Sequence, residues 1–376
     1  MTLLICGGAG YIGAHTCVAL GEAGFDDLLV LDNLSNSHRG VFDRLSLLMA
    51  HPPRFIKGDV RDASLLRRIF AEQSITGVIH FAGLKAVGES VERPLLYYDT
   101  NLGGFFTLLQ AMEDAGCRRL VFSSSATVYG HPQSVPIEES HPRSHTNPYG
   151  HTKLVCEDVL TALCRASSDW RTAVLRYFNP AGAHPSGLIG EDPRGTPNNL
   201  FPYVAQVAIG RHPHVRVFGN DYPTRDGSGV RDYLHVTDLA RAHVAAIRRI
   251  DAHDGSFTVN LGTGRGYSVL EVIDAFSQAC GRQIPYRIEP RRPGDAAQCY
   301  ADPTAAHALL GWRAEHDLPA MCADAWRWQH DYPQGFATAA IRVRRHGSRV
   351  LPISARRFSP PRPTHSPIPT RTGART

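Results

Sequence analysis

Short apolar runs alternate with amphipathic stretches through the first half of the chain. Six runs have the length of a buried strand, at 3–6, 28–31, 54–57, 77–80, 119–123 and 172–176. Helical patterns fall between most of these runs. Strands that alternate with helices of this length predict a parallel, doubly wound sheet. We therefore expect an α/β domain over residues 1–178.

The pattern loosens after about Tyr177, where Pro, Gly and Asn become common. Apolar residues keep a helical period over 236–250 and 269–280, and a last helix is predicted over 318–330. Thr237 is expected to cap the first of these helices. Residues 179–338 are therefore predicted to form a smaller α+β lobe, with some of its segments returning to the first domain.

Charge is distributed unevenly along the 376 residues, whose net charge is +5. Residues 341–376 carry nine arginines and no Asp, Glu or Lys, which leaves −4 for the preceding part of the chain. The basic character therefore gives no support for a nucleic-acid groove in the folded part. Because this Arg/Pro-rich end lacks an apolar pattern, we predict that residues 339–376 form a disordered tail. Binding of an anionic partner is the alternative.

The sequence predicts neither a membrane span nor a disulfide framework. There is no apolar run of about 18 residues, and the N-terminus leads into a glycine cluster without a basic flank or a cleavage site. The eight cysteines are scattered, and none form a CxxC pair. This spacing favours reduced thiols in a cytoplasmic protein over disulfides or a zinc site, so no metal is expected.

A glycine cluster follows the first predicted strand and opens a helix. Gly7, Gly10 and Gly13 form a GxxGxxG variant of the dinucleotide fingerprint of Rossmann-type domains. In that motif the glycines allow a tight turn, bring the backbone close to a pyrophosphate and let the helix pack on the strand. The helix N-terminus then faces the phosphates. An ordinary glycine turn is the alternative.

Acidic residues end the second and third predicted strands. Asp32 lies 19 residues after Gly13, where a carboxylate can bind the adenosine ribose and would repel a 2′-phosphate. The next residue is Asn33 rather than arginine, which favours NAD over NADP. Asp59 is placed for an adenine contact, with a turn or a helix cap as its alternative role.

Tyr149 and Lys153 are four residues apart at the start of a predicted helix, so both side chains lie on one face. A lysine cation near a phenol favours the phenolate, which would make Tyr149 a usable base. Ser125 ends the fifth predicted strand, where ligands gather in a doubly wound sheet. The alternatives are a surface Tyr/Lys pair and a polar strand end.

These features together resemble an extended short-chain dehydrogenase/reductase, and longer stretches are similar to the UDP-galactose 4-epimerase family. The similar stretches are GGAGYIGAHT (7–16), HFAGLKAVGES (80–90), FSSSATVYG (122–130), YFNPAGAHPSG (177–187), NNLFPYVAQVA (198–208), FGNDYPTRDGSGVRDYLHV (218–236) and PRRPGD (290–295). The resemblance spans about residues 1–336 and leaves out only the tail.

The resemblance implies a role for many single residues. Tyr149 would be the catalytic base, Lys153 would lower its pKa and bind the nicotinamide ribose, and Ser125 would position the sugar 4-hydroxyl. The cofactor positions of the family fall on Tyr11, Ile12, Asp32, Asn33, Asn36, Ser37, Asp59, Val60, Phe81, Ala82, Gly83, Lys85, Asn101 and Phe178, while Thr100 departs from the asparagine of bacterial relatives. The UDP-sugar positions fall on Asn179, Asn199, Leu200, Phe218, Arg231, Arg292 and Asp295.

The two arginines among these positions also make sense chemically, because guanidinium groups bind a diphosphate bidentately. The alternative for Arg231 is a salt bridge to Asp226 or Asp232.

The resemblance implies a homodimeric enzyme with tightly bound NAD that interconverts UDP-galactose and UDP-glucose through a transient 4-keto sugar. The expected dimer contact involves the regions near 92–115 and 149–166. One alternative is a nucleotide-sugar 4,6-dehydratase, but that family has Asp-Glu where this chain has Ala126-Thr127. A non-catalytic NAD-binding regulator is the other, and intact Ser125, Tyr149 and Lys153 argue against it.

Cys299 lies on the wall of the sugar pocket according to the resemblance. Members restricted to glucose and galactose tend to carry tyrosine there, whereas members that accept N-acetylated sugars carry a small residue. Cysteine at this position predicts that UDP-GlcNAc and UDP-GalNAc are also interconverted. The alternative is a small buried residue without a role in specificity.

Overall fold

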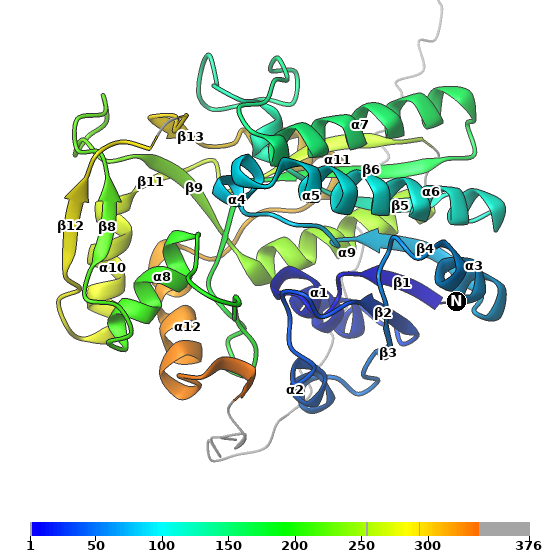
Figure 1. Cartoon of the computed structure of the whole chain (residues 1–376), viewed down its shortest axis with the longest axis horizontal. Coiled ribbons are helices and arrows are strands. Elements are labelled where there is room, and N and C mark those ends of the chain that lie inside the picture. The colour runs from blue at the N-terminus through cyan, green and yellow to red at the C-terminus, as the bar shows by residue number, and fades with distance from the viewer. Residues whose placement is uncertain (1, 253–254, 293, 338–376) are drawn as a thin grey trace, which may run out of the picture. The chain divides into compact units, whose positions relative to one another are not determined.

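A computed structural model describes residues 2–252, 255–292 and 294–337 of the chain (Figure 1). The predicted tail, 339–376, lies outside the described residues. None of the described helices is long and apolar enough to cross a membrane.

The larger part of the fold is a seven-stranded parallel sheet. Its strands lie in the order β10-β6-β5-β4-β1-β2-β3. Their bounds are β1 (Thr2–Cys6), β2 (Leu28–Asp32), β3 (Arg54–Lys57), β4 (Ile75–His80), β5 (Arg119–Ser125), β6 (Arg171–Tyr177) and β10 (Phe257–Leu261). The order reverses at β1, so the crevice that such sheets use for ligands lies beside the carboxyl end of this strand. The predicted doubly wound α/β fold is confirmed.

Helices cover both faces of this sheet, because most of its strands are apolar on both sides. Along β1, Leu3 and Ile5 pack on one face while Leu4 and Cys6 pack on the other. The first face is covered by α1 (Tyr11–Glu22), α2 (Val41–Leu48) and α9 (Val236–Ala252), and the second by α3 (Ala63–Glu72), α6 (Gly104–Asp114) and α7 (Pro148–Ala166). Between β4 and α6 the chain forms α4 (Val87–Glu92), α5 (Pro94–Tyr97) and the π-helix η1 (Tyr98–Gly103).

The second half of the chain builds a smaller α+β lobe, on the left in Figure 1. One sheet pairs β9 (Val230–His235) with β7 (Asn179–Ala181), β11 (Gly266–Ser268) and β13 (Gln298–Cys299), and a second pairs β8 (Val215–Phe218) with β12 (Tyr286–Glu289). The helices α8 (Leu200–Ala208), α10 (Val269–Cys280) and α12 (Leu318–Asp331) share a core with these strands. Three short helices complete the described chain, η2 (Ala126–Val128), α11 (Thr304–Leu310) and η3 (Gly335–Ala337).

Two segments beyond residue 178 lie in the larger sheet domain. β10 pairs in parallel with β6, and α9 packs on α1 in the same core cluster. The described residues belong to one compact unit, so the domain boundary at 178 stays a prediction.

The helix cap predicted at Thr237 is wrong. α9 begins at Val236, so Thr237 lies inside its first turn. The ring nitrogen Nδ1 of His235 accepts from the Thr237 backbone N–H at 3.1 Å. His235, the last residue of β9, therefore caps the helix, although Ser, Thr, Asp and Asn are the residues usually found at this position.

Candidate active site

The glycine loop after β1 has no room for side chains at two of the predicted positions. Gly7 has φ +80°, and a Cβ there would lie 2.6 Å from the Ala82 backbone nitrogen. A Cβ on Gly13 would lie 2.5 Å from the Gly7 carbonyl oxygen. Gly8, which the motif does not include, is equally constrained, because a Cβ would lie 2.7 Å from Val30. The loop is thus pressed between β4, β2 and α1.

The first turn of α1 is open to a ligand. Gly10 is the N-cap residue and offers no side chain to bond the free N–H groups. Unpaired amides and the helix dipole together favour an anion at this point. Tyr11, half-buried at the start of the helix, donates its hydroxyl to the Gly182 carbonyl at 2.7 Å and so links the loop to the lobe.

Asp32 ends β2 and organises the loops on either side of it. One carboxylate oxygen accepts from the Ala9 amide at 3.1 Å, and the other accepts from Leu34 N and Ser37 Oγ at 2.8 and 2.9 Å. The carboxylate is buried directly beside the glycine loop. Its bonds show that it holds the 34–37 turn, and its contact with the ribose stays a prediction.

Asp59 takes the turn role that the sequence left open for it, while its contact with adenine stays a prediction. Its carboxylate accepts from the Arg61 backbone amide at 2.9 Å, which forms a turn, and from Asn33 Nδ2 at 2.9 Å. Hydrogen bonds from the Arg61 guanidinium hold the pKa of this carboxyl well below its usual range. The Asn33 contact links Asp59 to the loop after β2, and α3 is capped by Asp62 and not by Asp59.

The loop after β4 is held by Asn101, which lies buried in the π-helix η1. Its side chain bonds both backbone groups of Leu84 at 2.7 and 3.0 Å and the Thr152 hydroxyl at 3.1 Å. π-helical turns are frequent at functional sites. Asn101 therefore fixes the loop of residues 81–85, which carries the predicted cofactor positions Phe81, Ala82, Gly83 and Lys85, against α7.

The three predicted catalytic residues come from β5 and α7. Ser125 is the last residue of β5, and Tyr149 and Lys153 lie one turn apart at the start of α7. Asn147 caps this helix by accepting from Gly150 N at 2.8 Å. The Lys153 ammonium donates to the Ser123 carbonyl at 2.7 Å and lies 4.9 Å from the Phe122 ring centre. The trio therefore lies at the carboxyl end of the sheet, next to the β4 loop.

Burial is the main influence on the pKa values of both Tyr149 and Lys153. Burial raises the pKa of the Tyr149 phenol, and a hydrogen bond with Ser125 opposes the rise. Burial lowers the pKa of Lys153 to about 8. The lowering of the Tyr149 pKa by Lys153, which the resemblance implies for a site with NAD⁺ beside the phenol, stays a prediction.

The predicted UDP-sugar positions lie on the lobe side of the same crevice. Asn179 begins β7, Asn199 precedes Leu200 at the start of α8, and Phe218 ends β8. The Arg292 guanidinium lies 3.8 Å from the centre of the Phe218 ring. Arg231 is 3.6 Å from the Asp295 carboxylate, so the alternative salt bridges to Asp226 or Asp232 are not formed.

Asp232, the neighbour of Arg231 in β9, holds the backbone that follows Cys299 in β13. It is fully buried and accepts hydrogen bonds from Thr263 N, Gly264 N and Ala301 N at 2.9, 3.1 and 3.1 Å. Burial raises the pKa of this carboxyl to about 6. Cys299 itself packs with Phe178 and Val128 in a small apolar cluster beside the catalytic strand.

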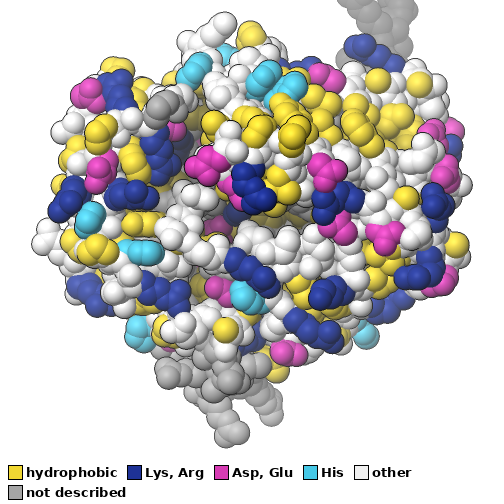
Figure 2. All heavy atoms as spheres, viewed as in Figure 1, with side chains coloured by type: hydrophobic (Ala, Val, Ile, Leu, Met, Phe, Trp, Pro, Cys, Tyr) yellow, Lys and Arg dark blue, Asp and Glu magenta, His cyan; other side chains and the backbone are white. Residues whose placement is uncertain are grey.

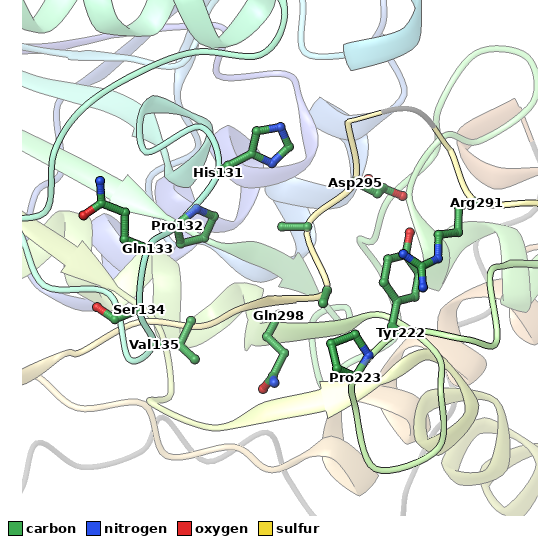
Figure 3. A pocket seen from close by; sticks show the side chains of 12 residues that line it. His131, Pro132, Gln133, Ser134, Val135, Tyr222, Pro223, Arg291, Asp295 and Gln298 are labelled. Atoms are coloured by element: carbon green, nitrogen blue, oxygen red, sulfur yellow. The ribbon is translucent and has the colours of Figure 1, made fainter.

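A cavity of about 410 Å³ lies between the loop of residues 131–135 and residues 222–223, 291 and 295–298 of the lobe (Figure 3). The Tyr222 hydroxyl is directed toward Asp295 in Figure 3 and has no hydrogen-bond partner among the described residues. Neither Ser125 nor Tyr149 lines this cavity, and Asp295 is the one predicted substrate position among its lining residues. Its walls are formed by His131, Pro132, Gln133, Ser134, Val135, Tyr222, Pro223, Arg291, Asp295, Ala296, Ala297 and Gln298.

Glu191 is a polar residue of the crevice that sequence reasoning missed. Its Oε1 lies 2.7 Å from Lys85 Nζ and accepts from Asn199 Nδ2 at 3.3 Å. It therefore joins a predicted cofactor position to a predicted substrate position. The only signal in the sequence was a charged run after Gly190, which gives no indication of what it contacts.

Fold and site together define a nucleotide-binding enzyme of the short-chain dehydrogenase/reductase class. A family model described as GDP-mannose 4,6 dehydratase matches residues 4–325. A UDP-glucose 4-epimerase of Bacillus subtilis is 54% identical over 90% of this chain and 100% of its own length.

Two crystal structures are similar throughout. The UDP-glucose 4-epimerase of Bifidobacterium longum in complex with NAD⁺ and UDP is 51% identical, with a TM-score of 0.86 over 89% of this chain and 100% of that one. The enzyme of Stenotrophomonas maltophila with bound NAD and formylated UDP-arabinopyranose is 50% identical, with a TM-score of 0.87 over 89% and 99% of the two chains. The chain therefore belongs to the UDP-glucose 4-epimerase family.

Proposed function

We propose that this protein is an NAD-dependent epimerase that interconverts UDP-galactose and UDP-glucose. The observation that carries the proposal is the grouping of Ser125, Tyr149 and Lys153 at the carboxyl end of β5, beside a dinucleotide loop. We also place the enzyme in the cytoplasm, because its eight cysteines are all free thiols.

The loops after β1 and β2 carry the groups that would bind NAD. Gly7 and Gly13 let the loop pack tightly against the protein backbone, and the N-terminus of α1, which Gly10 caps without a side chain, suits a pyrophosphate. Asp32 favours NAD over NADP, because its carboxylate would repel a 2′-phosphate. NAD bound here would supply a reversible hydride acceptor for the sugar C4.

The protein side chains supply the acid–base part of the reaction. Tyr149 would take the proton of the sugar 4-hydroxyl and return it after the 4-keto sugar has turned over. Ser125 would align that hydroxyl, and Lys153 would bind the nicotinamide ribose and stabilise the phenolate. The positive charge of the bound nicotinamide would act in the same direction and offset the desolvation that raises the pKa of Tyr149.

The lobe would hold the substrate by its UDP group. Arg231 and Arg292 offer guanidinium groups for the diphosphate, and Phe218 offers an aromatic face. A firm grip on UDP and a loose one on the hexose would let the keto sugar present either face for hydride return.

The test is turnover of UDP-galactose by the purified protein without added NAD. We expect UDP-glucose to form until both sugars are present at equilibrium. Formation of a 4-keto-6-deoxy sugar would favour the dehydratase alternative. That reaction needs an acid and a base where this chain has Ala126 and Thr127 in η2, and neither side chain can exchange protons near neutral pH.

We further propose that the enzyme accepts UDP-GlcNAc and UDP-GalNAc. Cys299 is small and packs in the apolar cluster beside Phe178, so it leaves volume that a tyrosine would fill. Cys299→Tyr is expected to lower turnover of UDP-GalNAc by about five- to 150-fold relative to UDP-galactose, since overpacking costs roughly 1–3 kcal/mol. Parallel assays measure the ratio of UDP-GalNAc turnover to UDP-galactose turnover. Cys280→Tyr is the matched control, because Cys280 ends α10 and packs in a different cluster from Cys299. Absence of UDP-GalNAc turnover in the unmodified enzyme, or an unchanged ratio in the variant, would refute this specificity.

A homodimer is proposed through the face formed by α4, α5, α6 and α7. Val87, Val91, Leu95 and Phe106 are exposed there, with Leu95 81% accessible, and Figure 2 shows apolar side chains gathered over this face. Contiguous apolar surface of this kind marks protein interfaces.

The Leu95→Asp variant is expected to sediment as a monomer at concentrations where the unmodified protein is a dimer, because a carboxylate cannot be buried there unpaired. Analytical ultracentrifugation measures the change. Leu309→Asp is the control, because Leu309 is an exposed leucine on α11, outside this face, and the variant should stay dimeric. A dimer in both variants would place the interface elsewhere.

A further inference from the structure

A short segment of the lobe, residues 191–194, is anchored at its base to the end of the described chain. The Glu191 carbonyl accepts from the Trp328 indole at 3.2 Å. The Asp192 carboxylate accepts from the Phe336 amide at 2.9 Å. These bonds fix the segment to α12 and η3, so it has a defined place beside the crevice.

The same segment reaches two separate loops of the sheet domain. Glu191 Oε1 lies 2.7 Å from Lys85 Nζ in the loop after β4. Arg194 donates from its backbone N–H to Asn36 Oδ1 and from its guanidinium to the Ser37 carbonyl, each at 3.1 Å. The Asp192 carboxylate lies 3.6 Å from His38 Nε2. Asn36, Ser37 and His38 all follow β2.

The order of the strands decides what lies between these contacts. β4 and β2 are the two neighbours of β1 in the sheet, and β1 carries the glycine loop. A segment bonded to the loop after β4 and to the loop after β2 therefore bridges the crevice from one side of the glycine loop to the other. Both loops carry predicted cofactor positions.

We propose that residues 191–194 are a clasp that closes over the dinucleotide site and retains the cofactor. The inference rests on the proposed binding of NAD. A dinucleotide seated on the glycine loop cannot leave past this segment until the contacts to at least one loop are broken. Glu191 also accepts from Asn199 on the substrate side, so the clasp joins both ligand sites.

The contacts differ in how they would respond to a change of conditions. In the ion pair between Lys85 and Glu191, the lysine side chain is 45% exposed, so salt should weaken the pair. The hydrogen bonds of Arg194 are less sensitive to salt, because their acceptors are neutral. High ionic strength should therefore speed the release of the cofactor only in part, because the hydrogen bonds of Arg194 remain.

Exchange of bound NAD against an excess of isotope-labelled NAD, followed by mass spectrometry of the released nucleotide, tests the clasp. The Asp192→Asn/Arg194→Ala double variant is expected to exchange at least about tenfold faster, the equivalent of losing one or two net hydrogen bonds. Glu191→Gln should also exchange faster and lose most of the dependence on salt. Arg54→Ala is the control, because it removes an exposed 2.8 Å ion pair with Asp27 that lies outside the crevice. This variant should exchange NAD at the rate of the unmodified protein.

Three outcomes are distinguishable. Faster exchange in the clasp variants alone supports the inference. Equal rates in all four proteins, with NAD present, would overturn the clasp and leave the proposed function intact. Absence of NAD from the unmodified protein, even after incubation with it, would overturn the proposed function and the clasp together.

Discussion

Replacing Tyr149 with Phe is expected to lower kcat by about 10²–10⁴-fold, the usual contribution of a general base. Tyr149 is the phenol at the start of α7 that Ser125 bonds, and phenylalanine keeps its ring while removing the proton acceptor. The KM for UDP-galactose should change little, because the proposed UDP contacts come from the lobe. Steady-state kinetics of the variant measure both quantities.

Tyr98→Phe is the matched control for this experiment. Tyr98 lies in η1, and its hydroxyl forms a 2.9 Å hydrogen bond with His151, which is on α7 like Tyr149. Tyr98 itself is not one of the three predicted catalytic residues. It should keep nearly full turnover. If Tyr149→Phe retains more than about a tenth of kcat, the loss is smaller than a general base supplies and the assignment is wrong.

The Glu157→Ala variant is expected to lower the free energy of unfolding by about 3–5 kcal/mol, because it leaves a buried cation without its partner. Glu157 is 3% exposed and accepts from Arg176 Nη2 at 2.6 Å and from Ser124 Oγ at 2.5 Å. These bonds tie α7 to β5 and β6 directly behind Ser125. Denaturant unfolding of the NAD-saturated protein measures the change, and the melting temperature should fall by several degrees.

The next residue along α7 provides the control. Asp158 is about half exposed and pairs with Arg143 at 2.7 Å, so Asp158→Ala should cost less than about 1 kcal/mol. Similar losses in the two variants would mean that the buried pair contributes no more than a surface pair. That result would contradict its proposed role in holding the catalytic helix.

The first half of the fold was predictable because its strands are buried on both faces. Runs such as 28–31 and 120–122 are continuously apolar and alternate with helical patterns, so the parallel, doubly wound sheet follows from the pattern. The catalytic trio was predictable for a related reason, since Tyr149 and Lys153 share a helix and their spacing fixes their relative position.

The lobe was less predictable because its structure depends on long-range pairing. β7 and β13 have only three and two residues, which is too short for any period to be visible. β10 returns to the sheet 80 residues after β6, and its five residues do not indicate which strand it pairs with. Glu191 was missed for the same reason, because its contacts with Lys85 and Asn199 depend on the path of a loop.

The central claim is that C4 of the sugar is oxidised and reduced again within one closed site. UDP-galactose carrying deuterium at C4 tests it directly when it is incubated with the enzyme in ordinary water without added NAD. Hydride that leaves C4 and returns to the opposite face predicts UDP-glucose with the deuterium retained at C4, as mass spectrometry of the product would show. Loss of the deuterium to solvent, or no conversion by protein that contains NAD, would contradict the account.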